Sequence, residues 1–277
     1  MKFTGILFKM RSQLESPIRY EMTQGEVRFD LTKMVGKNLR LTYSGNIFCT
    51  NCGAKLKKSY AQGYCFQCTM KLASCDLCIV RPETCHYEKG TCREPSWGEE
   101  NCLKPHIIYL ANSSGIKVGI TRKTQIPTRW IDQGATQALA ILEVKNRLSS
   151  GLIEVLFKKH IADKTDWRKM LKGEAAPVDL KELRDRLLKE LEGDLRSFEC
   201  TRLDEEVIDL SYPVERYPEK VSSYNLDKVS EITGKLIGIK GQYLIFDTGV
   251  INIRSHAGYE VTLEEIDGAQ DSLPQGL

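Results

Sequence analysis

The chain of 277 residues lacks any long hydrophobic run, because its apolar stretches span only a few residues each. A helix that crosses a membrane needs roughly 20 apolar residues in succession, so the sequence excludes a membrane span. Its first residues, MKFTGILFKMRS, also lack the apolar core and the small-residue cleavage site of a secretory signal. We therefore expect a cytoplasmic protein that does not bind membranes.

The chain also does not have the low hydrophobicity that is typical of disordered proteins. Hydrophobic residues make up 41% of the sequence and charged residues 28%, as in ordinary globular proteins. A chain of this length can bury a sizeable core and has room for two or three packed units.

The whole chain has no strong excess of one charge, since its net charge is +3. Individual segments, however, are strongly charged. Residues 103–172 hold 13 Lys and Arg against 5 Asp and Glu, whereas residues 173–277 hold 12 against 22. Residues 1–102 hold 15 against 10. The middle segment therefore favours polyanions, and the acidic final third offers a surface to a protein partner.

Cysteine is nearly absent outside one stretch: nine of the ten cysteines fall between Cys49 and Cys102, and only Cys200 lies elsewhere. A reducing compartment keeps thiols from pairing, so a dense cluster indicates metal ligands rather than disulfides. The same stretch has too few apolar residues to hold itself together without metal. We expect a metal-held unit here.

The first four cysteines of this stretch have the spacing of a zinc ribbon, Cys-x2-Cys, then twelve residues, then Cys-x2-Cys. They are Cys49, Cys52, Cys65 and Cys68. Each pair points two thiolates at one ion, and twelve residues are enough for a hairpin between the pairs. Gly53 and Gly63 suit the tight turns around the sulfurs. The pattern predicts a structural zinc ion.

The remaining five cysteines of the stretch allow a second four-ligand site with one spare. They are Cys75, Cys78, Cys85, Cys92 and Cys102. His86 or His106 could replace one of them as a ligand. A second zinc ion is favoured, although the open intervals of six, six and nine residues also suit an iron–sulfur cluster. The spacing does not decide which four residues bind.

The two ends of the chain read as strands. GILFKM, PIRYEM and the alternation of Val27, Phe29 and Leu31 predict strands within residues 1–48. The run ITGKLIGIKGQYLIFDTGVINIR predicts further strands near the C-terminus. FTGILFKM and ITGKLIGIK look alike, so we expect both ends to complete one sheet or barrel. An oligonucleotide-binding type of barrel would make Tyr243, Phe246 and Arg254 nucleic-acid contacts, although a structural role is favoured.

Helices are expected in the middle of the chain. ATQALAILEVKNRL and GLIEVLFKKHIADK have helical composition, with a break or cap at residues 149–151. Five leucines at three- and four-residue spacing between Leu180 and Leu195 predict an amphipathic helix that packs on a core or a partner.

Residues 106–121, HIIYLANSSGIKVGIT, predict two strands around an Asn-Ser-Ser-Gly turn. This segment and the residues after it resemble the start of a GIY-YIG nuclease domain, in which two short strands carry tripeptide motifs and an arginine follows on a helix. Residues 107–109 match the first tripeptide and residues 117–119 the second. An isoleucine replaces the first glycine, and the interval between the motifs is shorter than usual.

The resemblance implies catalytic roles for Tyr109, Lys117, Arg129 and Glu154. In GIY-YIG nucleases a tyrosine activates water, a glutamate holds Mg²⁺ or Mn²⁺ and an arginine stabilises charge on the phosphate. These roles fall on Tyr109, Glu154 and Arg129, while Lys117 could lower the pKa of the tyrosine. The same residues also fit a buried strand tyrosine, an exposed helix residue and an ion pair, in a fold that binds without cleaving.

Basic residues around this segment are candidate contacts to DNA or RNA. They include Arg122, Lys123, Lys158 and Arg168. Trp130 and Trp167 could stack on exposed bases, although Trp130, beside Ile131, also fits the core.

Nearly the whole chain resembles DUF2797, a family without an established function. The stretches that carry the resemblance are CHYEKGTCREPSWGEENC, RWIDQGATQALA, DKTDW and GIKGQYLIFDTGVINIR. We expect a zinc-containing nucleic-acid-binding protein that could also be a divalent-metal-dependent nuclease. The alternative is a non-catalytic scaffold in which zinc-held segments present surfaces to a protein partner.

The expected fold is α+β, with a zinc-ribbon module and a GIY-YIG-like α/β core between terminal β segments. The predicted segments are an N-terminal β segment (1–48), a zinc-binding module (49–105), the GIY-YIG-like core (106–175), an amphipathic helix and linker (176–211) and a C-terminal β segment (212–277).

Overall fold

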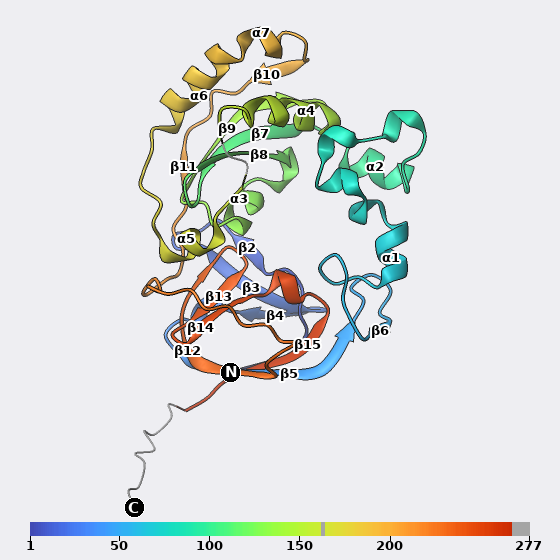
Figure 1. Ribbon diagram of the computed structural model, residues 1–277. Coiled ribbons are helices and arrows are strands. Elements are labelled where there is room, and N and C mark those ends of the chain that lie inside the picture. The colour runs from blue at the N-terminus through green and yellow to red at the C-terminus, as the bar shows by residue number, and fades with distance from the viewer. Residues whose placement is uncertain (162–163, 268–277) are drawn as a thin grey trace, which may run out of the picture. The chain divides into compact units, whose positions relative to one another are not determined.

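The computed structural model describes residues 1–161 and 164–267 (Figure 1). The expected helix over 151–164, the resembling stretch DKTDW and the C-terminal segment therefore lie partly outside the described residues. Contacts divide the chain into two compact units. The first comprises residues 1–13, 18–65 and 212 onward, and the second comprises residues 14–17 and 66–211. The five-segment division of the sequence stays a prediction.

The first unit is built from antiparallel strands of both chain ends. Its strands are β1 (Lys2–Ile6), β2 (Arg11–Gln13), β3 (Arg19–Gln24), β4 (Val27–Asp30), β5 (Asn38–Phe48), β6 (Lys55–Leu56), β12 (Glu231–Lys240), β13 (Tyr243–Phe246), β14 (Gly249–Asn252) and β15 (Tyr259–Glu265). Strands β2, β3 and β4 form a small sheet, and the others form a seven-stranded sheet in the order β1-β15-β5-β12-β13-β14, with β6 beside β5.

The prediction that both ends complete one sheet agrees with this order, because β1 pairs with β15 from Lys2–Glu264 to Ile6–Glu260. The barrel alternative is wrong. Among the described residues the strand order does not close on itself, since β1 and β14 end the path. Phe246 is buried in the sheet and is therefore not a surface contact.

The second unit combines a five-stranded antiparallel sheet with short helices. Its strands are β7 (His106–Asn112), β8 (Ile116–Arg122), β9 (Gln137–Val144), β10 (Cys200–Arg202) and β11 (Ile208–Asp209), in the order β10-β9-β7-β8 with β11 also beside β9. Its helices are α1 (Phe66–Lys71), α2 (Pro95–Asn101), α3 (Thr128–Asp132), α4 (Arg147–Phe157), α5 (Trp167–Lys172), α6 (Leu180–Glu190) and α7 (Glu192–Leu195).

The predicted hairpin is present, with Tyr109 opposite Gly119 in the register of β7 and β8. The predicted leucine helix is present as α6 and α7, which meet at Leu191. Its buried leucines pack with Ile108 of β7 and Phe157 of α4 in one hydrophobic core. Figure 1 shows α4 on one face of this sheet and α3 on the other.

The helix predicted over residues 135–148 is wrong. Gln137–Val144 forms strand β9, which pairs with β7 on one side and with β10 and β11 on the other. Most of its residues are buried, and a strand buried on both faces has a continuous apolar run that composition alone does not separate from a helix. Residues 149–151 do not break the helix either, because they lie inside α4.

In the described part of the chain, no helix is both long and apolar enough to cross a membrane.

Candidate functional site

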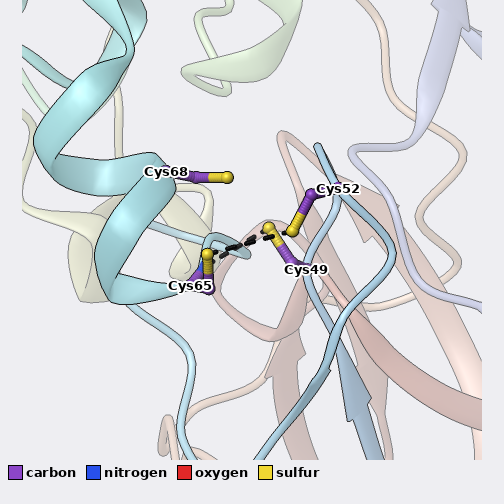
Figure 2. Close-up of side chains that lie close together, drawn as sticks. All are labelled: Cys49, Cys52, Cys65 and Cys68. Carbon is purple, nitrogen blue, oxygen red and sulfur yellow. Dashed lines mark hydrogen bonds between the residues drawn. The ribbon is translucent and has the colours of Figure 1, made fainter.

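A cluster of four thiols is formed by the predicted zinc ligands, Cys49, Cys52, Cys65 and Cys68 (Figure 2). Their sulfur atoms all lie within 4.8 Å of one another, and the sulfurs of Cys52 and Cys65 are 3.9 Å apart. Four thiolates at about 2.3 Å from one zinc ion lie about 3.8 Å apart, so the donor set and its spacing fit a tetrahedral zinc. Four thiolates leave no open position for substrate, which favours a structural ion.

The first Cys-x2-Cys turn follows directly from strand β5. β5 pairs with β6 at Ile47–Leu56, so the chain reverses between them. Within this turn the N–H of Cys49 donates to the carbonyl of Ala54 at 2.9 Å, and the N–H of Gly53 donates to that of Cys49. Gly53 has a φ of 72°, which few other residues adopt, as the sequence predicted for this turn.

The second arm is held against the first by backbone contacts. The N–H of Thr50 donates to the carbonyl of Gly63 at 2.7 Å, and a Cβ at position 63 would lie 2.8 Å from Cγ2 of Thr50. Gly63 also has a φ of 118°, which side-chain-bearing residues rarely adopt. Both the backbone conformation and the lack of space for a Cβ therefore favour glycine at this position. Cys65 then precedes α1, and Cys68 lies on it.

Backbone donors prepare the sulfur of Cys49 to bind a cation. Burial works to raise the pKa of this thiol, but hydrogen bonds from the backbone of Cys52, Cys65 and Asn51 outweigh it and lower the pKa to about 6. The N–H of Cys65 lies 3.2 Å from the sulfur of Cys49. A thiolate is the form that binds metal, so these bonds favour the ion.

The remaining cysteines of the stretch lie among short turns of the second unit and are not joined in disulfides. Cys78, Cys85, Cys92 and Cys102 line one small, partly open cavity, which Cys75 does not line. His86 also lines it. His106, the other predicted substitute ligand, is buried in β7, its Nδ1 bonds the carbonyl of Lys104 at 2.8 Å, and it is not among the lining residues.

The four residues implied as catalytic come from both hairpin strands and two helices of the second unit. Tyr109 lies on β7, Lys117 on β8, Arg129 on α3 and Glu154 on α4. Tyr109 and Gly119 are paired across the hairpin, and alternate strand residues share a face, so Lys117 lies on the same face as Tyr109. Glu154 and Lys117 are both buried.

The ring of Tyr109 lies over Gly119, where no side chain stands in its way. A Cβ at position 119 would lie 2.5 Å from its hydroxyl oxygen. The pairing of β7 with β9 shifts register between Ile108 and Tyr109, which locally re-aims the strand. The ring also meets that of Trp130 edge-on, with centroids 6.0 Å apart.

The hydroxyl of Tyr109 is fully buried and donates to Oε1 of Gln133 at 3.0 Å. Burial raises the pKa of this phenol, Arg129 and Gln133 act to lower it, and Glu154 acts to raise it. Arg129 and Glu154 therefore both lie within electrostatic reach of Tyr109. The sequence analysis did not single out Gln133, because a lone glutamine carries no spacing signal.

Each of the four predicted nucleic-acid contacts has a partner within the chain. Nζ of Lys123 lies 2.7 Å from Glu143, and Nζ of Lys158 lies 3.3 Å from Glu154. Arg122 donates to Asn101, a residue of α2. Arg168 stacks on the ring of Trp167 at 4.2 Å.

Trp130 is buried, in agreement with the core alternative and against base stacking.

The N-terminus of α4 connects this site to the cysteine-lined cavity. Asn146 caps the helix by accepting a hydrogen bond from the N–H of Ser149 at 2.9 Å. The next residue, Arg147, donates from its side chain to the carbonyls of Cys78 and Ile79. Neither residue stands out in the sequence, because a single Asn and a single Arg carry no spacing signal.

A family model described as "Protein of unknown function (DUF2797)" matches residues 36–261, which is most of the chain. No curated protein and no solved structure matches it significantly.

Proposed function

The chain belongs to the DUF2797 family, and we propose that it is a zinc-containing protein that binds nucleic acid at the surface around Arg129 and Lys158. One observation carries the proposal: Arg129 and Glu154, from two different helices, both lie within electrostatic reach of the phenol of Tyr109. The guanidinium of an arginine is planar and can donate two parallel hydrogen bonds to a phosphate group. A guanidinium that neighbouring polar groups hold in place is therefore suited to binding a phosphodiester.

Two further features support this proposal. The order of elements, hairpin strands β7 and β8, helix α3, strand β9 and helix α4, is the order in which the GIY-YIG resemblance requires its tyrosine, arginine and glutamate. The same elements lie in the segment with 13 basic against 5 acidic residues. A local excess of cations accelerates and strengthens association with polyanions. Cysteines that are not joined in disulfides suit a reducing compartment such as the cytoplasm.

Salt-dependent binding tests the proposal. Anisotropy of labelled single-stranded and duplex oligonucleotides, at 50 to 300 mM salt, should give affinity that falls steeply with salt. Arg129→Ala should weaken binding of every sequence and reduce the slope of log affinity against log salt by about 1. Arg196→Ala is the matched control, because Arg196 is an exposed arginine paired with Glu192 on α7. No binding at low salt, or equal loss in both variants, would overturn the proposal.

Divalent-metal-dependent hydrolysis of a phosphodiester is the second candidate activity of this site. Glu154 would hold Mg²⁺ or Mn²⁺, and Arg129 and Lys117 would face the phosphate. Tyr109 would first have to lose its own proton to solvent, after which its phenolate would accept a proton from the attacking water. The hydroxyl of Tyr109 is buried on Gln133, so this activity requires a rearrangement that opens it to water.

A panel of single-stranded, duplex and branched substrates with Mg²⁺ or Mn²⁺ tests this activity. Cleavage should disappear in Glu154→Gln, which keeps the shape of the side chain and removes its charge. Cleavage that survives this substitution would come from a different site or a contaminant.

A non-catalytic scaffold is the alternative function. It is favoured by the ion pairs that occupy Lys123 and Lys158, because these reduce the charge available to a polyanion. In that case the acidic final third would face a protein partner, and the anisotropy experiment would show no binding.

A further inference from the structure

Residues 72–102 form a chain of single turns with no strand and almost no apolar core. The turns are Ala73–Cys75, Leu77–Ile79, Pro82–Thr84 and Tyr87–Lys89, followed by α2. Ala73, Pro82, Gly98 and Cys102 are their buried residues. So little buried apolar surface does not hold such a segment in one conformation, and small units of this kind are usually stapled by metal or disulfides. No disulfide joins the cysteines of this segment.

Four of these thiols line one small, partly open cavity. Cys78, Cys85, Cys92 and Cys102 line it, and each comes from a different turn or loop. Cys78 and Cys102 both interact electrostatically with Cys85, and Cys102 also does so with Cys92. The lining also includes Ile79, Tyr87 and Trp97, together with the polar side chains of Asp76, His86 and Arg93. Four thiols that line one cavity form a donor set for a soft metal.

The spacing of these thiols differs from that of the zinc cluster. In the described residues, the cysteine sulfurs that group within 4.8 Å are those of Cys49, Cys52, Cys65 and Cys68. No three of the cavity thiols meet that limit in the described part of the chain. A single zinc ion needs its thiolates about 3.8 Å apart. A cluster of several irons binds each thiolate through a different iron atom, so its ligands stand farther apart.

The other donors near this cavity are engaged elsewhere. Asp76, Cys78 and His86 bring one donor atom each within 4.8 Å. However, the carboxylate of Asp76 is paired with Arg93 at 2.7 Å. Nδ1 of His86 bonds the hydroxyl of Thr91 at 2.8 Å. Nε2 of His86 lies 3.5 Å from the carboxylate of Asp76, so the two side chains hold each other within the loop, and the candidate ligands are the four thiols that line the cavity.

Cations lie where an anionic cluster would need them. Arg122 and Arg147 both interact electrostatically with Cys102. The backbone N–H of Arg147 donates to the carbonyl of Cys102 at 2.8 Å, and its guanidinium donates to the carbonyls of Cys78 and Ile79. A cluster held by four thiolates carries net negative charge, which nearby cations and hydrogen bonds stabilise.

We propose that Cys78, Cys85, Cys92 and Cys102 hold an iron–sulfur cluster. The centre is separate from the zinc site and does not rest on the proposed binding of nucleic acid. Its place in the fold makes it a support for helix α4. A Cβ at Gly151 of α4 would lie 2.5 Å from the backbone nitrogen of Glu83, so the turn between two ligands packs directly on the helix that carries Glu154.

Metal and sulfide analysis of the full chain, purified without oxygen, tests this assignment. We expect one zinc per chain together with iron and acid-labile sulfide in equal amounts. Broad absorbance near 400 nm should bleach on reduction, and the reduced sample should show an electron paramagnetic resonance signal. Two zinc ions per chain without iron would overturn the cluster.

Paired cysteine variants test the ligand set. Cys85→Ser should lose iron and sulfide and keep its zinc. Cys75→Ser is the matched control, because Cys75 belongs to the same segment but does not line the cavity, and it should keep both metals. Equal loss of iron in the two variants would overturn the ligand set. If Cys85→Ser does not fold, the spectra and metal content of the unaltered chain and of Cys75→Ser still decide the question.

Discussion

At the residue scale, the contact between Tyr109 and Gly119 organises the candidate site. The ring of Tyr109 occupies the space that Gly119 leaves on the neighbouring strand, and its hydroxyl donates a hydrogen bond to Gln133. The sequence predicted the tyrosine and the glycine as parts of two motifs. It did not predict Gln133 as the partner, because the pairing of β7 with β8 and the position of α3 determine which polar group meets the hydroxyl.

Replacing Gly119 should show how tightly this contact is packed. Gly119→Ala places a Cβ 2.5 Å from the hydroxyl oxygen of a fully buried ring, so we expect a loss of roughly 1–3 kcal/mol in the free energy of unfolding. Gly193→Ala is the control: Gly193 lies in α7 with open space around it, and this substitution should stabilise by up to about 1 kcal/mol. Urea unfolding measures both, and equal effects would contradict the packing argument.

Lys240 is a second informative residue that sequence patterns did not reveal. It is fully buried at the end of β12, and it faces the rings of Tyr212 and Tyr217 at 5.3 and 5.0 Å. Among the residues that the structure describes, its Nζ has no hydrogen-bond partner. Burial lowers the pKa of this amine from 10.5 to about 8. That shift corresponds to roughly 3 kcal/mol of destabilisation while the amine is charged, which the rings partly offset.

Lys240→Met should therefore stabilise the fold at pH 7, by about 1–3 kcal/mol. Below pH 8 the amine is protonated in both folded and unfolded chains, and the full cost is present. Between pH 8 and 10.5 the unfolded chain binds more protons than the folded one, so the stability of the unaltered protein rises with pH and the advantage of the variant shrinks. Urea unfolding at pH 7 and 9.5 measures this, with Lys235→Met, paired to Glu215, as control. A gain that grows with pH would refute it.

At the scale of elements, residues 135–148 have the composition of a helix, but the tertiary structure places a strand there. Ala, Leu, Ile and Glu favour a helix in isolation, yet β9 is paired on both sides. The hairpin β7–β8 and the leucine helix were predictable because each carries a periodic pattern with a turn or a long stripe. The start of α4 was predicted several residues too late, since a single capping Asn is a weaker signal than the Ser-Ser-Gly run that follows it.

The cap of α4 is therefore a clear test of where the helix begins. Asn146→Ala should reduce the free energy of unfolding by about 1 kcal/mol, because the N–H of Ser149 loses its acceptor. Asn146→Asp preserves an acceptor and should restore most of the stability. Ser149→Ala should have little effect, whereas a cap at residue 149 would make it the costly substitution. Thermal and urea unfolding distinguish the two positions.

At the scale of the whole molecule, charge and metal are distributed unevenly along the chain. The basic segment 103–172 forms most of the antiparallel sheet in the second unit, but several of its lysines are paired with nearby carboxylates. The cysteine stretch follows directly after β5, and its first turn is shaped by that strand and β6. Metal content should accordingly determine how much of residues 49–102 is ordered.

Removal of the zinc ligand Cys52 tests this dependence. Cys52→Ser should lower the zinc content by one ion per chain and reduce the midpoint of thermal unfolding, because structural zinc contributes directly to folding. Cys200→Ser removes a thiol on β10 outside both clusters and should keep all zinc. Elemental analysis with thermal unfolding provides the measurement. Unchanged zinc in Cys52→Ser would show that these four thiols are not its ligands.

The sequence by itself determined the features that depend on local spacing: the four thiols of the zinc cluster, the glycines of its turns, the hairpin and the leucine stripe. Each is encoded within a few residues, where backbone geometry fixes which side chains can meet. Only the tertiary structure decided the rest. It made residues 137–144 a strand, selected four of five cysteines around one cavity, and brought Arg129 and Glu154 to a buried Tyr109. These outcomes depend on contacts between distant segments, which no local pattern specifies.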